Sequence, residues 1–591
     1  MNFNVKLPRF CRPAGTLLTG LMLSGCAALL PKPPSPVTEP LAVVADRLPN
    51  AQLTDGLLLQ FLLSEVAAQR GSPGAAFISY MQMARETRDP RTAQRAVELA
   101  LSARQPDGAL QAAQLWRELA PNNREAWQLT AALLATQGKL DVLEALLVAD
   151  LKKNPRPSDA IISAQQAIAR SKDPAAGYAL AQRIFAPFTR QVAAQIALSQ
   201  AAFAAEQPAA ALAHAELAYA AAPQSEQVAL IRSQLRASAD APAAITVLTD
   251  YLKKNPTARN ARLQLARLYA STKELAQARE QFSALAKPQT SANGITQRDP
   301  DALYALAILA IQTKDWPAAT EGFKSYLSEI KNSPERDPSN ALMSLASIAE
   351  EQRQYLQAAE WYGQVEAPEQ LFIAKIRAAL ALSKAGQTDA AKQSLSSLKP
   401  RAEDDQVRLV LAQAQLARDS NQDAQAYEIL TAGLKAAPDN PELLYDHATA
   451  AEKRNQFAEA EAQFRRLIAL KPDNAQAYNG LGYALAERNL RLDEAQQLIE
   501  KAVKLAPDDG YILDSLGWLQ YRQGKLTEAL KTLNTAYAMR PDAEIAAHLG
   551  EVLWVSGQAE AAKNIWRSAQ QIDPKNQTLI NTLARFKVVL P

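Results

Sequence analysis

The chain contains few of the residues that metal sites and disulfide frameworks require. Its 591 residues include two cysteines and three histidines. Cys11 and Cys26 both stand near the start of the chain, and His214, His447 and His548 are far apart in sequence. No spacing among them matches a known set of metal ligands. We therefore expect no structural disulfide, no metal site and no cofactor.

Glycine is also scarce, with 21 residues in all. The sequence has no GxSxG, HExxH or CxxC motif and no glycine-rich loop of the kind that cradles phosphate. The paired acids Asp404-Asp405 and Asp508-Asp509 stand at expected turns, where carboxylates commonly cap helices. The absence of a nucleophile–base constellation predicts that the chain is not an enzyme.

The sequence also lacks a large excess of positive or negative charge. The formal net charge is +3, and the first 25 residues contribute three basic residues, Lys6, Arg9 and Arg12, with no acid. The remainder is neutral overall, which argues against a nucleic acid partner. No stretch alternates convincingly between apolar and polar residues, so the composition predicts an all-α protein.

What the sequence does contain is helical periodicity, clearest in the stretch Gly510–Pro541. Apolar residues recur there at spacings of three and four on either side of Gly524, which predicts two amphipathic helices. Gly524 is expected to end the first helix in a left-handed conformation, and Pro541 to stop the second. The stretch is therefore a helix–turn–helix unit.

The same unit recurs along the chain. Prolines 438, 472, 507, 541 and 574 close successive copies about 34 residues apart. The Leu-Gly pairs Leu481-Gly482 and Leu549-Gly550, the turn glycines Gly524 and Gly557 and the closing prolines resemble the tetratricopeptide repeat family. That resemblance implies an α-solenoid (superhelix) of tetratricopeptide-like repeats. From residue 53 to 574 there is room for about fifteen units.

The first residues resemble a bacterial lipoprotein signal. A basic start and a short apolar run lead to Leu23-Ser24-Gly25-Cys26. By this resemblance Cys26 is the lipidated N-terminus of the mature protein, and Ala27 after it favours sorting to the outer membrane. Prolines between residues 27 and 50 predict an extended tether. We expect the repeats to face the periplasm.

The resulting division of the chain has six parts. They are a signal peptide (1–25), a lipidated Cys and Pro-rich tether (26–50), degenerate repeats (51–288), middle repeats (300–438), well-formed C-terminal repeats (439–576) and a capping helix (577–591). The polar segment Lys287–Asp299 between two of them is expected to be a long loop or a junction.

Binding to another protein is the expected activity of such an array, because the first helix of each unit lines its concave wall. We predict that the exposed contact residues there are Asn479, Tyr483, Asp514, Trp518, Tyr521, Arg522, Glu551 and Trp554. Trp518 and Trp554 have an equally plausible role in packing between neighbouring repeats. The basic residues of a carboxylate clamp are missing, and Glu544 stands where such a clamp needs positive charge.

The chain has a lipobox (the sequence Leu23-Ser24-Gly25-Cys26), then a tether and then a long repeat array. In this order it resembles the outer-membrane lipoproteins that serve as adaptors for a periplasmic carboxy-terminal processing protease. That resemblance implies recruitment and activation of the protease and presentation of cell-wall hydrolases as its substrates. Two alternatives stay open on the residues alone. One is an assembly or pilotin-like factor for envelope secretion or polysaccharide export, and the other is a peptidoglycan-binding repeat protein.

Overall fold

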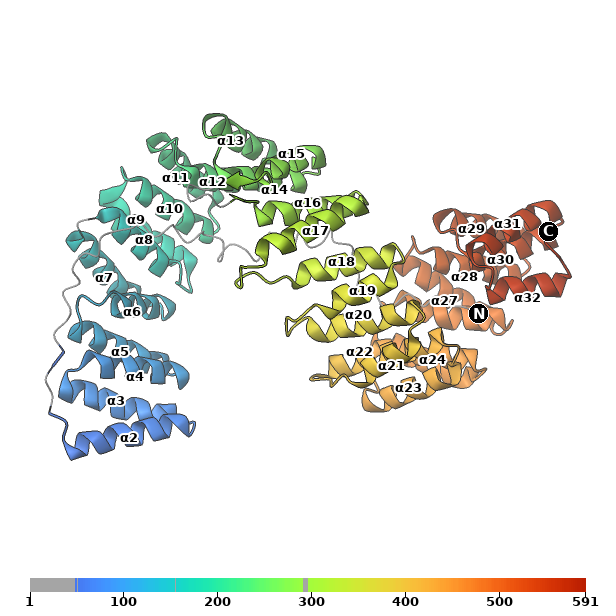
Figure 1. The fold of residues 1–591 in the computed structure, drawn as a ribbon, viewed down its shortest axis with the longest axis horizontal. Helices are drawn as coiled ribbons and strands as arrows, with labels where there is room; N and C mark the ends of the chain where they lie inside the picture. The colour runs from blue at the N-terminus through green and yellow to red at the C-terminus, as the bar shows by residue number, and fades with distance from the viewer. Residues whose placement is uncertain (1–47, 50–51, 155, 291–295, 591) are drawn as a thin grey trace. The chain divides into compact units, whose positions relative to one another are not determined.

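A computed structural model describes residues 48–49, 52–154, 156–290 and 296–590. Cys26, the signal sequence and nearly all of the tether lie outside the described residues. The chain divides into two compact units, one ending at Leu309 and one beginning at Ala310, which we call the N-terminal and C-terminal units. In each, consecutive helices lie side by side (Figure 1).

The N-terminal unit is built from short antiparallel helices joined by tight turns. Its elements are α2 (Asp55–Gln69), α3 (Pro73–Thr87), α4 (Pro90–Ser102), α5 (Pro106–Leu119), α6 (Arg124–Thr136), α7 (Leu140–Lys153), α8 (Pro157–Ile168), α9 (Pro174–Phe185), the 3₁₀ helix η2 (Ala186–Phe188), α10 (Val192–Ala204), α11 (Pro208–Ala221), α12 (Glu226–Ala237), α13 (Ala241–Lys254), α14 (Arg259–Ser271) and α15 (Leu275–Leu285). The strands β1 (Gln289–Thr290) and β2 (Thr296–Gln297) follow, and then α16 (Pro300–Gln312), which crosses the division between the units.

The C-terminal unit continues the same pattern. Its helices are α17 (Trp316–Ile330), α18 (Ser339–Glu351), α19 (Tyr355–Gly363), α20 (Leu371–Lys384), α21 (Thr388–Ser396), α22 (Glu403–Asp419), α23 (Asp423–Ala436), α24 (Pro441–Lys453), α25 (Phe457–Leu470), α26 (Ala475–Glu487), α27 (Leu492–Leu505), α28 (Gly510–Arg522), α29 (Leu526–Met539), α30 (Ala543–Val555), α31 (Ala559–Ile572) and α32 (Gln577–Phe586). Within the described residues, α2 to α31 make fifteen successive helix pairs, the number expected from the period.

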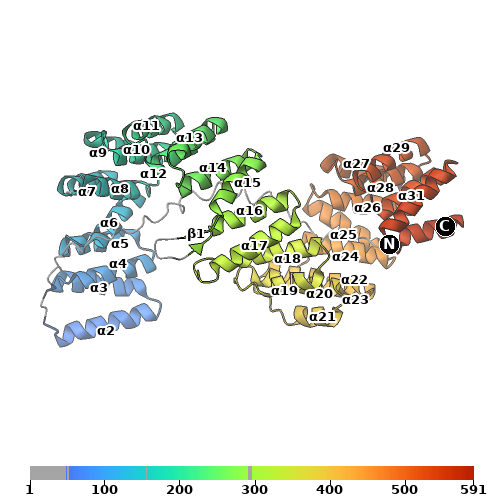
Figure 2. The same ribbon diagram turned by 45° about the horizontal axis from the view of Figure 1, so that its top comes forward.

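The polar segment after α15 differs from the expected loop. Gln289–Thr290 pairs antiparallel with Thr296–Gln297, so a small hairpin (labelled β1 in Figure 2) replaces part of it. The expectation of an all-α protein holds elsewhere among the described residues, where every other regular element is helical.

Turn chemistry explains why the helices end where they do. Gly524 has φ +79° between α28 and α29, the left-handed conformation that glycine adopts without steric cost. The next residue closes the turn, since the backbone N–H of Lys525 donates to the carbonyl oxygen of Gln520 at 2.9 Å. The sequence prediction for this turn is confirmed.

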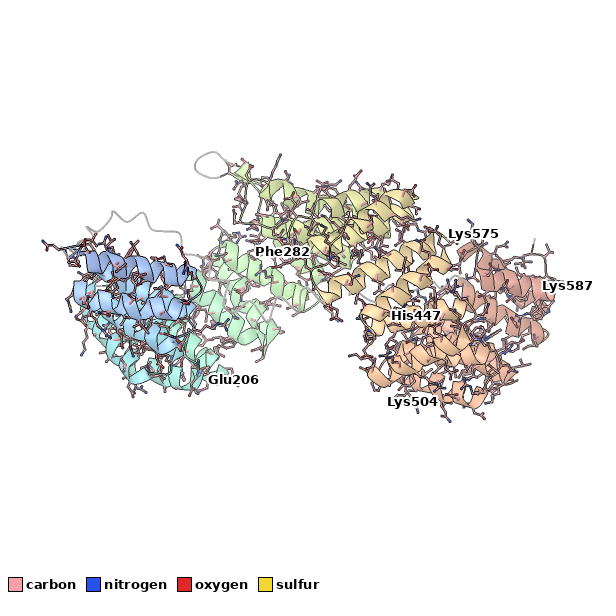
Figure 3. The ribbon with its side chains drawn as sticks, turned by 90° about the horizontal axis from the view of Figure 1, so that it is seen from below. Glu206, Phe282, His447, Lys504, Lys575 and Lys587 are labelled. Carbon is pink, nitrogen blue, oxygen red and sulfur yellow. The ribbon has the colours of Figure 1, made fainter. Side chains whose placement is uncertain are left out.

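Small residues let the two helices of a unit approach closely. A Cβ added at Gly517 would stand 2.6 Å from Cγ of Leu533, and one added at Gly482 would stand 2.6 Å from Cγ1 of Ile499. The glycine of each Leu-Gly pair therefore marks the point where the helices of a pair touch. In the N-terminal unit a large side chain, the buried Phe282 (labelled in Figure 3), belongs to a core cluster with the small residues Ala266 and Ala278.

The last helix, α32, covers the end of the array. The ring of Phe586 stacks on that of Trp566 with centroids 6.4 Å apart, and Leu583 packs against the same cluster. Arg585 forms an ion pair with the buried carboxylate of Glu551. These contacts cover the outer side of the last helix pair, which is the position expected for a capping helix.

Candidate functional site

An open groove of about 1080 Å³ lies in the C-terminal unit. Four first helices of successive repeats, α24, α26, α28 and α30, line it together with the turns that precede them. Such a volume is at the upper end of ligand-binding clefts in proteins. The first helices of these repeats thus line one continuous groove.

One register position runs through the groove. Tyr445, Asn479, Asp514 and His548 each stand seven residues after the closing proline of the preceding unit. Equivalent positions of successive repeats lie beside one another when the repeats stack. The first three line the groove, and the fourth supports Asp514 from the neighbouring helix. The sequence carries this register in the fixed distance from each closing proline, and Tyr445 and His548 are the two of the four residues that the sequence prediction lacks.

The lining is strongly acidic. It includes nine carboxylates and two arginines, Arg353 and Arg540. The carboxylates are Glu442, Asp446, Glu452, Asp508, Asp509, Asp514, Asp542, Glu544 and Asp573. This charge is the opposite of what a clamp for a C-terminal carboxylate requires. The sequence had singled out only Asp514 of this set as a contact residue.

Tyrosines stand among the carboxylates. Burial raises the pKa of Tyr483 well above its usual value, and the nearby charges of Glu544, Glu487 and Asp514 raise it further. Tyr445 behaves in the same way, with its pKa raised by burial and then by Asp446. Both phenols therefore remain neutral, and each offers a ring and a hydroxyl beside negative charge.

Several groove carboxylates are poorly solvated. Burial raises the pKa of Glu544 to about 7; His548 lowers it, while Asp514 and Asp542 raise it. Burial also raises the pKa of Glu452 to about 7, although Arg488 lies within 3.1 Å and favours the charged form. Repulsion between neighbouring acids is therefore built into the wall.

The best-formed charged contact beneath the groove joins α28 to α30. Nδ1 of His548 lies 2.9 Å from Oδ2 of Asp514, and both side chains are buried. Burial by itself lowers the pKa of His548, but the charge and hydrogen bond of Asp514 raise it to about 9. The imidazole is therefore protonated at neutral pH and forms a buried ion pair.

Trp518 belongs to this contact and not to the exposed surface. Its ring stacks on that of His548 with centroids 4.2 Å apart, and its Nε1 donates to Oε2 of Glu487 at 2.7 Å. Only 3% of the residue is exposed. The expectation that Trp518 is an exposed contact residue is wrong, because the stacked neighbours on α26 and α30 enclose the ring.

The other predicted contact residues divide between the groove and the repeat interfaces. Asn479, Tyr483 and Asp514 line the groove, but Tyr483 and Asp514 are buried in its wall, so the exposure expected for these two is also wrong. Tyr521 donates from its hydroxyl to Oε1 of the buried Glu551 at 3.2 Å, so the exposure expected for Glu551 is wrong. Arg522 donates to the carbonyl oxygen of Glu487, and the ring of Trp554 lies 5.6 Å from that of Trp566. These four residues hold successive helices together.

A second candidate surface lies on α2 in the N-terminal unit. Six large apolar side chains of this helix are exposed: Leu58, Leu59, Phe61, Leu62, Leu63 and Val66. A contiguous apolar surface of this kind often marks a protein-binding site. Within the described residues, no helix is long and apolar enough to span a membrane, and no group of three or more potential metal ligands is present.

Sequence models of the tetratricopeptide repeat family match residues 235–294, 445–510 and 515–576. A tetratricopeptide repeat-containing protein of Pseudomonas aeruginosa, PA4667, is 43% identical over 211 residues, or 36% of each chain. The mitochondrial import receptor subunit TOM70 of Rattus norvegicus is 26% identical over 26% of this chain and 25% of its own. This chain therefore spans little more than a third of the length of the first of these relatives.

Solved structures of repeat proteins are also similar. A tetratricopeptide repeat protein of Thermus thermophilus is 23% identical, covers 32% of this chain and 100% of its own, and has a TM-score of 0.28. Yeast Tom70 is 14% identical, covers 89% of this chain and 98% of its own, and has a TM-score of 0.35. The sequence matches and the helix pairs together show an all-α solenoid of tetratricopeptide-type repeats.

Proposed function

We propose that this tetratricopeptide-repeat chain is a lipid-anchored adaptor at the outer membrane that recruits a periplasmic carboxy-terminal processing protease and presents cell-wall hydrolases to it. The observation that carries the protein-binding part is the groove formed by α24, α26, α28 and α30. The lipobox ending at Cys26 and the proline-rich tether support the anchor.

An adaptor needs separate surfaces for the protease and its substrate. The groove is acidic and belongs to the C-terminal unit, whereas the exposed face of α2 is apolar and belongs to the N-terminal unit. Surfaces of such different chemistry suit two different proteins. Holding both on one chain raises their effective concentration toward each other without any new catalytic group.

The test is photo-crosslinking in cells. A photoreactive amino acid replaces Asn479 in the groove, and a matched variant carries it at Lys504, an exposed position on α27 outside the groove. We expect the first variant to capture a periplasmic protease or a cell-wall hydrolase, identified by mass spectrometry. Capture of an outer-membrane export channel, or of no protein beyond the Lys504 control, would contradict the adaptor proposal.

The anchor has its own test. Cys26→Ala removes the thiol that carries the lipid, so we expect the protein to move from the membrane fraction to the soluble periplasmic fraction. Substitution of Cys11, which stands before the proposed cleavage site, is the matched control and should leave the membrane fraction unchanged. Continued membrane association of Cys26→Ala would overturn the lipoprotein assignment.

A further inference from the structure

We propose that the groove binds an extended segment of the partner protein that is rich in lysine or arginine. This inference rests on the proposed function, because it specifies which part of a partner the groove takes. Three independent features support it: the balance of charge in the lining, the supply of hydrogen-bond acceptors without donors, and the tyrosine rings.

The negative charge of the lining favours a positively charged ligand. Some acids are already paired, since Asp446 contacts Arg418 at 2.9 Å and Glu452 contacts Arg488 at 3.1 Å. Asp508 and Glu544 form no ion pair with a lysine or arginine among the described residues, and the nearby charge of His548 only partly offsets the burial of Glu544. A cationic side chain in the groove would supply the missing counter-charge, whereas an acidic segment would add repulsion.

Hydrogen-bond acceptors are also in excess. Oδ1 of Asn479 is buried in the lining and has no donor among the described residues. A buried acceptor without a donor costs about 1–3 kcal/mol, which a ligand recovers by donating to it. Lysine and arginine carry three and five N–H donors and no acceptor, so they match a wall made mainly of carboxylates and an amide oxygen.

The groove already contains one guanidinium in contact with a tyrosine. The guanidinium carbon of Arg540 lies 4.5 Å from the centre of the Tyr511 ring, and the Tyr511 hydroxyl donates to Oδ2 of Asp542 at 3.1 Å. A cation over the face of a tyrosine whose hydroxyl is bonded to a carboxylate is therefore a geometry that this wall accommodates. Tyr445 and Tyr483 line the same groove as the carboxylates Asp446, Asp514 and Glu544.

The length of the groove favours a segment of chain over a single small cation. Four neighbouring first helices at interaxial distances of about 10 Å span roughly 30 Å. An extended peptide covers that distance with about nine residues. Alternate side chains of such a segment point to one side, so about every second residue faces the acidic wall.

The experiment measures binding of a fluorescein-labelled twelve-residue peptide to the full-length purified chain by fluorescence anisotropy. The peptide alternates lysine with alanine and carries one central leucine, and matched peptides replace every lysine by glutamate or by glutamine. We expect the lysine peptide to bind at least about tenfold more tightly than the glutamine peptide, with the difference shrinking as salt is raised. The glutamate peptide should not bind.

A variant in which two groove carboxylates are neutralised tests whether the peptide binds in the groove. Glu442→Gln with Glu544→Gln keeps the size of both side chains and should weaken binding of the lysine peptide about tenfold. Glu428→Gln with Glu528→Gln changes the net charge by the same amount on exposed positions of α23 and α29, and should have little effect. Equal binding by the two double variants, preference for the glutamate peptide, or full competition by spermidine at peptide concentrations would overturn the proposal.

Failure here is distinguishable from failure of the adaptor function. If the Asn479 crosslink captures a protease or hydrolase and Glu442→Gln with Glu544→Gln captures it equally well, the adaptor stands and the basic segment is wrong. If the wild-type groove binds the lysine peptide but captures no periplasmic protein in cells, the preference for basic segments stands and the adaptor is wrong.

Discussion

The two units of this chain fill their interiors differently. Among the described residues, the buried polar side chains before Leu309 are uncharged: Ser64, Thr130, Ser163, Gln195, Ser199 and Ser233. After Ala310 they include five ionisable groups: Asp446, His447, Asp514, His548 and Glu551. The helix pairs follow the same pattern in both units, so the repeat itself does not require buried charge.

Two of the neutral side chains, Ser199 and Ser233, form their hydrogen bonds within one repeat. Oγ of Ser199 donates to the carbonyl oxygen of Ala211 at 2.8 Å, and Oγ of Ser233 donates to that of Ala244 at 3.1 Å. Each joins the two helices of a single pair. The ion pair of Asp514 and His548 instead joins the first helices of two adjacent pairs, directly beneath the groove. Buried charge therefore occurs where neighbouring units must hold a binding wall in register.

The largest predicted effect removes one partner of that ion pair. Asp514→Asn removes the carboxylate that keeps the buried imidazole of His548 protonated, and we expect the loss of this ion pair to cost roughly 3–5 kcal/mol. Ser199→Ala in the N-terminal unit removes a neutral hydrogen bond and should cost about 1 kcal/mol. Hydrogen exchange of the amides in α28 and α30, compared with those in α10 and α11, reports both changes locally.

Equal losses of local stability for Asp514→Asn and Ser199→Ala would contradict the proposed difference between the two units. A local loss of about 1 kcal/mol for Asp514→Asn would mean that losing the buried ion pair costs no more than losing a neutral hydrogen bond. Spread of the effect to α10 and α11 would contradict the nearest-neighbour coupling expected of a repeat array.

More of the fold than of the candidate site could be predicted from the sequence. The 34-residue spacing of the prolines, the turn at Gly524 and the contacts at Gly482 and Gly517 are local, so the sequence carries them directly. Whether a side chain on a first helix faces the groove or the next repeat depends on neighbours about 31 to 34 residues away. Trp518 was therefore expected at the surface, although its partners Glu487 and His548 enclose it.

The next prediction uses the sign of two histidine pKa shifts. His548 has its pKa raised to about 9 by Asp514 against the effect of burial, so its stabilising contribution is complete below pH 6.5 and is lost as pH rises toward 9. The loss amounts to about 3 kcal/mol. Burial lowers the pKa of His214 in the N-terminal unit, where its neighbours at hydrogen-bond distance are Tyr178 and Gln195. Its contribution is present above pH 6.5 and is lost as pH falls.

Pulse proteolysis in urea, with the cleavage sites mapped by mass spectrometry, measures this difference between pH 5 and pH 9. The C-terminal repeats should lose resistance toward pH 9, and His548→Gln should flatten their response above pH 6.5. Glu544 acts in the same direction at lower pH, because its raised pKa of about 7 makes its contribution disappear between pH 4.5 and 7. A C-terminal unit that grows more resistant from pH 6.5 to 9 would contradict the assignment of His548.

A smaller effect separates two helix glycines. Gly517→Ala places a methyl group 2.6 Å from Cγ of Leu533, and we expect the overpacking to cost roughly 1–3 kcal/mol. Gly177→Ala in the N-terminal unit meets Cγ2 of Ile168 at 3.3 Å, so the gain in helix propensity should offset the tighter contact. Urea midpoints measured by far-ultraviolet circular dichroism give both values. Equal shifts would show that the closer packing at Gly517 is not a constraint.

The smallest effect concerns the turns that both units share. Gly524 has φ +79° in the C-terminal unit, whereas Arg104 has φ +54° at the corresponding turn between α4 and α5. Both turns are closed by the same hydrogen bond of 2.9 Å, from Lys525 to Gln520 and from Gln105 to Ala100. A side chain in this conformation costs about 1 kcal/mol. Gly524→Ala should therefore lose about that much, and Arg104→Gly should gain somewhat less, since glycine also makes the unfolded chain more flexible. Hydrogen exchange at the amides of Lys525 and Gln105 measures the stability of each turn separately.

If Arg104→Gly slows exchange while Gly524→Ala accelerates it, the turn geometry is common to both units. The difference between the units then lies in the side chains that their interiors bury. If Arg104→Gly accelerates exchange, the arginine itself stabilises its turn, and the N-terminal repeats depend on surface contacts that the C-terminal repeats do without.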